Sequence, residues 1–123
     1  MPKILIADDS RLSRAMTRRL LSQFNVEVVE AASGEESIQM YEQEKPDAVI
    51  LDLMMPGISG QETLKRLRQI DPNARVIIMS ADSQDSTVQE ALDTGAVYFV
   101  PKPPDADQLA DVLEQSLGIQ LQR

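Results

Sequence analysis

The sequence predicts an α/β fold in which a five-stranded parallel sheet is doubly wound, with five helices on its two faces. Short apolar runs alternate with amphipathic segments along all 123 residues, which is typical of repeated strand–helix units. Polar residues follow several of these runs directly, and the carboxyl ends of parallel strands share one edge of a sheet. The chain is therefore expected to form a single domain, residues 1–123, with its functional site at that edge.

Five short apolar runs are expected to form the strands. A fully buried parallel strand appears as a continuous apolar run, as in Ile4–Ala7 and Val49–Leu51. The second run contains Glu27 and Glu30, so one of its sides is expected to meet water, which is typical of an edge strand. The predicted strands span residues 3–7, 26–31, 48–52, 75–80 and 96–100.

Five amphipathic segments are expected to form the helices. Ser33 and Ser59 are each followed three residues later by Glu, which is typical of the capping box that opens a helix, and Gly118 is placed to end the last one. The fourth segment has the weakest apolar stripe, and we expect it to be the most mobile. The predicted helices span residues 10–23, 34–44, 60–70, 84–94 and 106–117. The apolar stripe of the first helix, which we expect to face the core, consists of Leu12, Ala15, Met16 and Leu20.

The order of the strands follows from two constraints. Crossovers between parallel strands are right-handed, and the polar second strand belongs at an edge. Together these give the order 2-1-3-4-5, a flavodoxin-like arrangement in which the first and third strands are neighbours at the switch point of the sheet. Asp8 and Asp9 follow the first strand and Asp52 follows the third, so we expect these three carboxylates to converge.

The composition narrows the classes of function. The chain has no cysteine and no histidine, which excludes disulfides, thiolate or imidazole metal sites and donation of phosphate from its own histidine. The net charge of −8 argues against binding of nucleic acid and favours partners with basic surfaces. No apolar stretch approaches the ~20 residues of a membrane span, and a strand pattern begins at once, without a signal peptide. We therefore expect a cytoplasmic protein that does not bind membranes.

The three aspartates indicate a metal site. Carboxylates gathered at one point repel one another and cannot all stay ionised without a cation. Mg²⁺ prefers oxygen ligands, and with no sulfur or imidazole available it is the expected ion, with Mn²⁺ as the substitute. Taken alone, Asp8, Asp9 and Ser10 could equally cap the first helix, but Asp52 beside them favours metal binding.

Asp52 leads into an irregular loop that contains Pro56 and Gly57. An aspartate can simply begin such a loop, or its carboxylate can be a nucleophile that forms an acyl phosphate. In the second case Mg²⁺ would bind one phosphoryl oxygen, Lys102 a second as a point charge, and the Ser80 hydroxyl the third. Ser80 and Lys102 follow the fourth and fifth strands, which places them at the same edge of the sheet as Asp52.

Four motifs together resemble one family. They are Asp8-Asp9, Asp52-x-x-x-Pro56-Gly57, Ser80-Ala81 and Lys102-Pro103. In combination they resemble the receiver domain of two-component response regulators over essentially the whole chain, whose length is similar to that of free-standing, CheY-type members. The resemblance implies that a histidine kinase or a histidine phosphotransfer protein phosphorylates Asp52. It also implies that phosphorylation and dephosphorylation of itself are the only chemistry, so that the chain is a signalling domain and not an enzyme.

The resemblance implies roles for individual residues around the metal. Asp9, Asp52 and the backbone carbonyl of Met54 would ligate Mg²⁺, and Asp8 would help through a water molecule. The peptide bond between Lys102 and Pro103 would be cis, as X-Pro bonds permit.

The resemblance further implies a switch and an output face. On phosphorylation the Ser80 hydroxyl would turn toward the phosphoryl group and the Phe99 ring would turn inward. The fourth helix, fifth strand and fifth helix would then bind a downstream protein target. We expect a monomer, with a dimer on activation as the alternative, and a target with a basic surface. The acidic residues that suggest such a target are Asp85, Glu90, Asp93, Asp107 and Asp111.

The first helix also carries a basic stripe, formed by Arg11, Arg14 and Arg18. Such a stripe is either a solvated face or the surface on which the phosphodonor docks. The sequence leaves both interpretations open.

Three alternative functions remain at this stage. The chain could be a receiver domain of a longer, multidomain response regulator. It could be a haloacid-dehalogenase-type phosphatase, although that pattern places its second acid two residues after the nucleophile, whereas here the acids are adjacent. It could also be a scaffold with a degenerate site, although the intact set of acids, serine and lysine counts against this.

Overall fold

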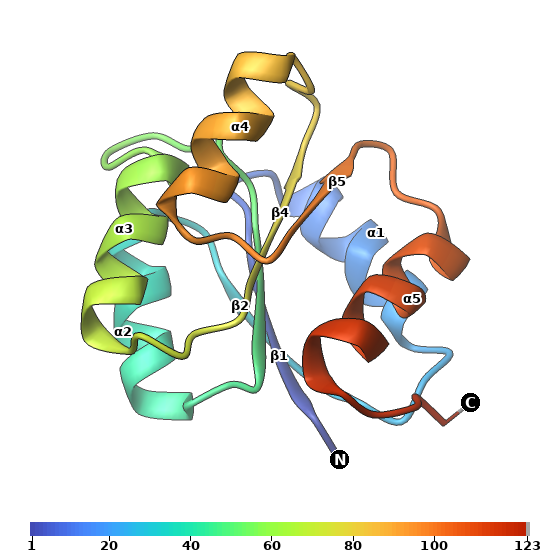
Figure 1. Cartoon of the computed structure of the whole chain (residues 1–123). Coiled ribbons are helices and arrows are strands. Elements are labelled where there is room, and N and C mark those ends of the chain that lie inside the picture. The colour runs from blue at the N-terminus through green and yellow to red at the C-terminus, as the bar shows by residue number, and fades with distance from the viewer. Residues whose placement is uncertain (123) are drawn as a thin grey trace.

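The computed structural model describes residues 1–122 and shows one parallel sheet between two layers of helices (Figure 1). The strand order is β2-β1-β3-β4-β5, which confirms the predicted doubly wound topology. The acidic second strand lies at an edge, as expected. The strands are β1 (Lys3–Ala7), β2 (Glu27–Ala31), β3 (Ala48–Leu51), β4 (Val76–Ser80) and β5 (Tyr98–Pro101).

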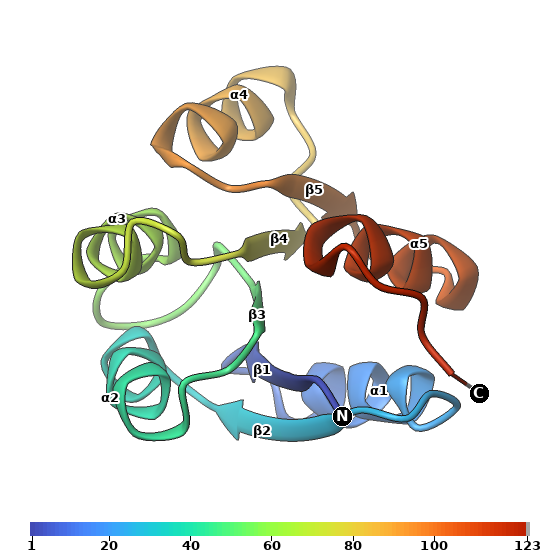
Figure 2. The ribbon, with the colours of Figure 1, turned by 60° about the horizontal axis from the view of Figure 1, so that its bottom comes forward.

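The helices divide between the two faces of the sheet (Figure 2). α1 (Arg11–Leu21) and α5 (Ala106–Leu117) cover one face, and α2 (Gly34–Glu44), α3 (Gly60–Ile70) and α4 (Asp85–Thr94) cover the other. The predicted bounds of α2, α3 and α5 are confirmed, and those of α1 and α4 differ by one or two residues. Within residues 1–122, none of the helices combines the length and the apolar character needed to cross a lipid bilayer.

The hydrophobic core has two halves, one on each face of the sheet. Successive side chains of a strand point to opposite faces. Ile4 and Ile6 of β1 therefore pack with residues of α1 and α5, whereas Leu5 and Ala7 pack with residues of α2, α3 and α4. Because both faces are covered, β3 and β4 are entirely buried, as their continuous apolar runs indicated.

Side-chain caps explain where most of the helices begin. Ser10, Ser33, Ser59 and Asp105 each accept a hydrogen bond from a backbone N–H in the first turn of the helix that follows. The N-cap of α4 is Gln84, whose side chain makes no such hydrogen bond. At the other end of α4 the Ala96 N–H donates to the Ala91 carbonyl, so β5 begins at Tyr98, later than predicted. The mobility expected for α4 stays a prediction.

The predicted inward stripe of α1 is wrong for Leu12 and Met16, whereas Leu20 does pack against the core. Leu12 and Met16 are 71% and 52% exposed, whereas Thr17 is buried. The Arg14 side chain also lies on the inner side, where the carboxylate of Glu30 in β2 balances its charge at 3.1 Å. A paired polar residue thus occupies a position that hydrophobic spacing alone would give to an apolar one. The helix is rotated accordingly, so that Leu12 and Met16 face outward beside the carboxyl edge of the sheet, whereas Leu20 packs partly against the core.

Candidate functional site

Three carboxylates meet at the carboxyl ends of β1 and β3. Ala7 and Leu51, the last residues of the two strands, are partners in the parallel register, so the residues that follow lie level. Asp8, Asp9 and Asp52 each offer a carboxylate oxygen, and these oxygens lie within 4.8 Å of one another. Asp8 and Asp52 are buried and Asp9 is exposed. The convergence expected from the strand order is therefore present.

Lys102 joins two of these carboxylates. Its Nζ donates hydrogen bonds of 2.8 Å to Asp8 Oδ2 and of 2.8 Å to Asp52 Oδ2. Burial would lower the pKa of Lys102, but the hydrogen bonds with Asp52 and Asp8, together with their charges, outweigh burial and raise that pKa. Lys102 is thus a fixed ammonium group, and it leaves the cluster of three acids with an excess of negative charge.

Backbone amides hold the remaining carboxylate oxygens of the buried pair. The Met54 N–H donates to Asp52 Oδ1 at 3.0 Å, and the Ser10 N–H donates to Asp8 Oδ1 at 2.9 Å. Each of the two carboxylates therefore has one oxygen on Lys102 and the other on the loop that follows its own strand. These contacts fix the position of both side chains.

The loop after Asp52 depends on two glycines. Gly57 has a φ of 75°, a left-handed conformation that favours glycine. At Gly60, the first residue of α3, a Cβ would collide with the Asp52 carbonyl, so α3 can begin tight against the strand end only with glycine there. Glu35 of α2 accepts a hydrogen bond of 3.3 Å from the Ile58 N–H. Hydrogen bonds from its own backbone N–H and from that of Ile58 lower the pKa of Glu35, which indicates a carboxylate that holds the loop in place.

Ser80 and Phe99 share one face of the sheet. Ser80, the last residue of β4, is fully buried, and its Oγ accepts a hydrogen bond of 3.3 Å from the Asp82 N–H. Phe99 pairs with Ile78, two residues before Ser80, and packs on the core half covered by α2, α3 and α4. The neighbouring Tyr98 points to the opposite face, where its hydroxyl donates to a glutamine of α5. Phe99, not Tyr98, therefore lies on the same face of the sheet as Ser80, and the switch role of this pair stays a prediction.

Two arginines of the basic stripe predicted on α1 are paired with a glutamate of β2. Arg14 Nε and Arg18 Nε donate to the two carboxylate oxygens of Glu30, at 3.1 Å and 2.7 Å. Arg11 is exposed. Two of the three arginines thus pair with the edge strand β2, although the Arg18 side chain is still 49% exposed, and both interpretations of the stripe stay predictions.

A groove beside Lys102 was missed from the sequence. It has a volume of about 320 Å³, and the exposed side chains of Leu12 and Met16 line one side of it. Pro103 and Pro104 line the other side, beyond the Lys102–Pro103 peptide bond, which is cis as the resemblance implied. The sequence feature that could have indicated this groove is the pair of apolar residues Leu12 and Met16, which we assigned to the core instead.

The donor set of the acidic cluster fits Mg²⁺. All three side chains supply hard oxygen ligands, they lie close together, and an uncompensated negative charge remains after Lys102 is counted. Met54 adjoins the cluster through its N–H, and the role of its carbonyl as a ligand stays a prediction.

Comparisons with known proteins point to one family. Residues 4–114 match the family described as the response regulator receiver domain. The chain is 39% identical over 117 residues to the chemotaxis protein CheY of Listeria monocytogenes, covering 94% of this chain and 98% of that protein. It is 36% identical over 117 residues to the sporulation initiation phosphotransferase F of Bacillus subtilis, covering 95% of this chain and 94% of that protein. A crystal structure of a CheX-CheY-BeF3-Mg+2 complex from Borrelia burgdorferi matches with a TM-score of 0.85 and 32% identity, covering 92% of this chain and 87% of that one.

We expect Lys102→Met to destabilise the protein at pH 7 without divalent cations, by about 1–3 kcal/mol, because it leaves two buried carboxylates without their cation. Urea unfolding followed by circular dichroism measures this difference. Since the pKa of Lys102 is raised on folding, the stabilisation is present below the unfolded-state value of about 10.4 and is lost as the pH rises through the folded-state value. The deficit should therefore persist to about pH 10, vanish at higher pH, and shrink when Mg²⁺ is added.

The matched control is Lys65→Met, which removes an exposed lysine of α3 and should change stability little. Equal stability of the two variants at pH 7 would show that the bridge from Lys102 to the acids does not stabilise the fold.

Proposed function

We propose, on the basis that the chain belongs to the response regulator receiver domain family, that it accepts a phosphoryl group on Asp52 and thereby switches the binding of a downstream protein. The chain is a CheY-like receiver of two-component signalling. The observation that supports the proposal most strongly is the environment of Asp52. Asp52 is 7% exposed, its carboxylate receives hydrogen bonds from Lys102 and from the Met54 N–H, and it lies beside two further acids.

In the proposed reaction, an Asp52 carboxylate oxygen attacks the phosphorus of a phosphohistidine. The new oxygen–phosphorus bond forms as the phosphorus–nitrogen bond breaks, and the imidazole nitrogen leaves with the electron pair and takes up a proton. Mg²⁺ bound by the acids would neutralise charge on the phosphoryl oxygens. Lys102 already lies 2.8 Å from Asp52 Oδ2, so its ammonium group can pass to a phosphoryl oxygen by a small movement. The acyl phosphate is later hydrolysed, and we assign no turnover of other substrates to the chain.

Phosphorylation would act on the fold through Ser80. Its hydroxyl now accepts a hydrogen bond from the Asp82 N–H in the loop between β4 and α4. If the Ser80 hydroxyl turned toward a phosphoryl group on Asp52, it would release the Asp82 N–H. It would also free space on the face of the sheet where Phe99 lies. Phe99 is only partly buried against the core, so its ring can move further inward. The change would pass from the phosphorylated edge to β5 and the adjoining α4.

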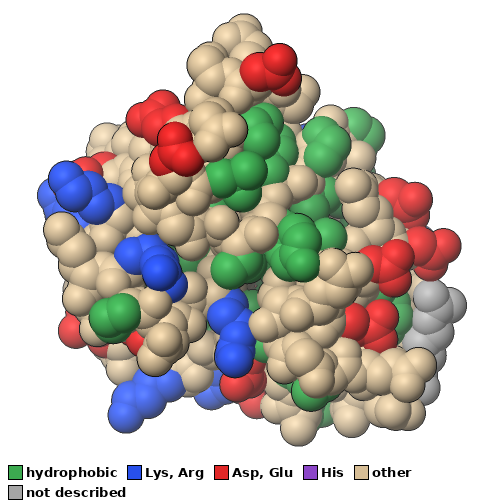
Figure 3. Space-filling model, viewed as in Figure 1, with side chains coloured by type: hydrophobic (Ala, Val, Ile, Leu, Met, Phe, Trp, Pro, Cys, Tyr) green, Lys and Arg blue, Asp and Glu red, His purple; other side chains and the backbone are tan. Residues whose placement is uncertain are grey.

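The face formed by α4, β5 and α5 is the proposed output surface. Figure 3 shows hydrophobic side chains gathered between α4 and α5, with acidic side chains around them. Leu92 and Val97 belong to this face and are each 40% exposed. The five acidic residues predicted for the face are all exposed. We propose a downstream protein that covers the apolar centre and presents basic residues to the acidic rim.

The groove between α1 and the loop after β5 is the proposed docking surface for the phosphodonor. It lies directly beside Lys102, so a protein seated there can bring a phosphohistidine close to Asp52. Leu12 and Met16 offer exposed apolar surface on one wall, and Pro103 and Pro104 form a rigid second wall. A histidine kinase or a histidine phosphotransfer protein that presents an amphipathic helix would fit this apolar groove. We place both proteins, and this chain, in the cytoplasm.

Incubation with Mg²⁺ and a small phosphodonor such as acetyl phosphate tests the central chemistry. Intact-mass measurement should show the addition of one phosphoryl group, and peptide mapping should place it on Asp52. Asp52→Asn should not gain the group, because the amide is not a nucleophile of comparable strength. A chain that stays unmodified would be a degenerate scaffold, and rapid repeated hydrolysis of phosphomonoesters would instead indicate a phosphatase.

Leu12→Asp tests the docking surface. With a phosphohistidine protein that transfers to the native chain, the transfer rate should fall about tenfold, the effect of losing roughly 1.4 kcal/mol of association. The rate with acetyl phosphate should stay within about twofold, because the reacting groups are untouched. Leu92→Asp, which alters an exposed leucine of α4, is the control and should transfer normally. The assignment of the groove would be contradicted if Leu12→Asp lowered the transfer rate from both donors, or if it lowered the rate from neither donor.

A further inference from the structure

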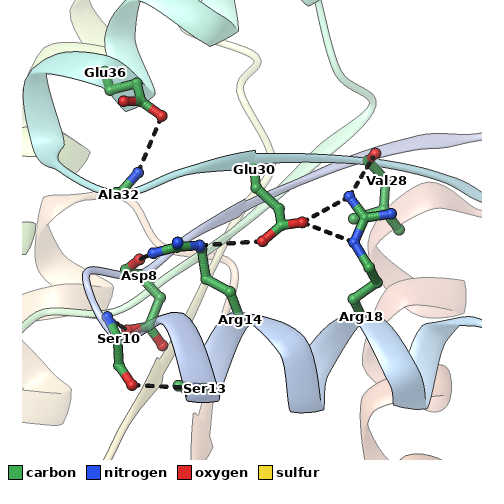
Figure 4. A network of polar contacts seen from close by, with 9 residues as sticks. All are labelled: Asp8, Ser10, Ser13, Arg14, Arg18, Val28, Glu30, Ala32 and Glu36. Atoms are coloured by element: carbon green, nitrogen blue, oxygen red, sulfur yellow. Dashed lines mark hydrogen bonds and ion pairs between the residues drawn. The ribbon is translucent and has the colours of Figure 1, made fainter.

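The backbone of Asp8 is held as firmly as its side chain. Its N–H donates to the Ala31 carbonyl at the end of β2, at 3.0 Å. Its own carbonyl accepts a hydrogen bond of 2.7 Å from Arg14 Nη1, as Figure 4 shows. This carbonyl and the Asp9 N–H belong to the same peptide group, which is planar. The guanidinium of Arg14 therefore fixes the orientation of the link between two of the three acids of the site.

Arg14 is itself held in place from its other side. Its Nε donates to Glu30 Oε1 at 3.1 Å, and its side chain is only 16% exposed. Without this partner, a guanidinium so close to three carboxylates could turn toward them and compete with a metal ion. Glu30 lies on the edge strand β2, between Arg14 and Arg18, and so directs Arg14 to the backbone carbonyl (Figure 4). The network runs from β2 through α1 to the acidic cluster.

We propose that Arg14, held by Glu30, is a positioning residue of the Mg²⁺ site, which acts by fixing the peptide group between Asp8 and Asp9. This inference rests on the proposed function, because it concerns the metal on which phosphorylation depends. Groups that orient metal ligands commonly affect metal affinity although they do not touch the metal. Arg14 belongs to this class, since its contact is with the Asp8 carbonyl and its charge is balanced by Glu30.

The charge of Arg14 and its positioning role predict opposite effects on metal binding. If Arg14 acted only through its charge, its removal would leave the site more negative, and Mg²⁺ would bind more tightly. If Arg14 positions the peptide group, its removal frees that group to rotate, and Mg²⁺ binds more weakly. The direction of the change in affinity therefore separates the two roles.

The test compares Arg14→Met with Arg18→Met. Both substitutions remove an arginine of α1 that is paired with Glu30, but only Arg14 reaches the Asp8 carbonyl. The dissociation constant for Mg²⁺ is measured by titration calorimetry on the full chain without a phosphodonor, and the melting temperature is measured in parallel. We expect about tenfold weaker Mg²⁺ binding for Arg14→Met and a change within about twofold for Arg18→Met. Unchanged or tighter binding by Arg14→Met would overturn the inference, whatever its melting temperature, since a merely structural role would lower only the latter.

A second comparison, of Arg14→Lys with Arg18→Lys, keeps the positive charge at each position. It is decided by the same change in the dissociation constant for Mg²⁺, and it replaces the first comparison if Arg14→Met does not fold. Lysine cannot reproduce the fork that binds Glu30 and the carbonyl together, so Arg14→Lys should also bind Mg²⁺ more weakly. If the native chain binds Mg²⁺ and is phosphorylated while the Arg14 variants match it, this inference alone fails. If the native chain does neither, the proposed function fails, and the inference is overturned with it.

Discussion

The hydrogen bonds from one ammonium group to two buried carboxylates organise this protein. Lys102 lies after the last strand, yet it reaches Asp8 after the first strand and Asp52 after the third. Buried carboxylates are costly unless they are paired, so this bridge allows the two acids to be held together at one edge of the sheet. The same bridge leaves negative charge uncompensated, which is the condition for attracting a divalent cation.

The fold supplies the geometry that this bridge requires. Because β1 and β3 are parallel neighbours in register, their carboxyl ends present aspartates side by side, and the order of the sheet places β4 between them and β5. The two buried acids have further contacts, since the Met54 amide holds the Asp52 carboxylate and the Arg14 guanidinium holds the Asp8 carbonyl. The Ser80 hydroxyl, by contrast, accepts an amide hydrogen bond from the neighbouring loop, and we propose that it leaves this bond on phosphorylation.

Most of the fold and of the acidic site could be predicted from short-range patterns. Continuous apolar runs identified the buried strands, the two glutamates of β2 identified the edge, and residues directly after the strands identified the site. The rotation of α1 could not be predicted in this way, because it depends on Arg14 pairing with Glu30 on a neighbouring strand. Hydrophobic spacing treats arginine as a surface residue, so it assigned Leu12 and Met16 to the core. The groove that these residues line could therefore not be predicted from the sequence, and neither could the hydrogen bond from Arg14 to the Asp8 carbonyl.

A crystal structure of the chain with Mg²⁺ and beryllofluoride, an analogue of the phosphoryl group, tests the central claim most directly. The account predicts the beryllium group on an oxygen of Asp52, Mg²⁺ among the three aspartates, Lys102 Nζ moved from Asp52 onto the analogue, and the Ser80 hydroxyl turned away from the Asp82 amide. If Asp52 carried no adduct under saturating conditions, or if Lys102 still bridged Asp8 and Asp52 with the adduct in place, the acidic cluster would not be the phosphoryl switch described.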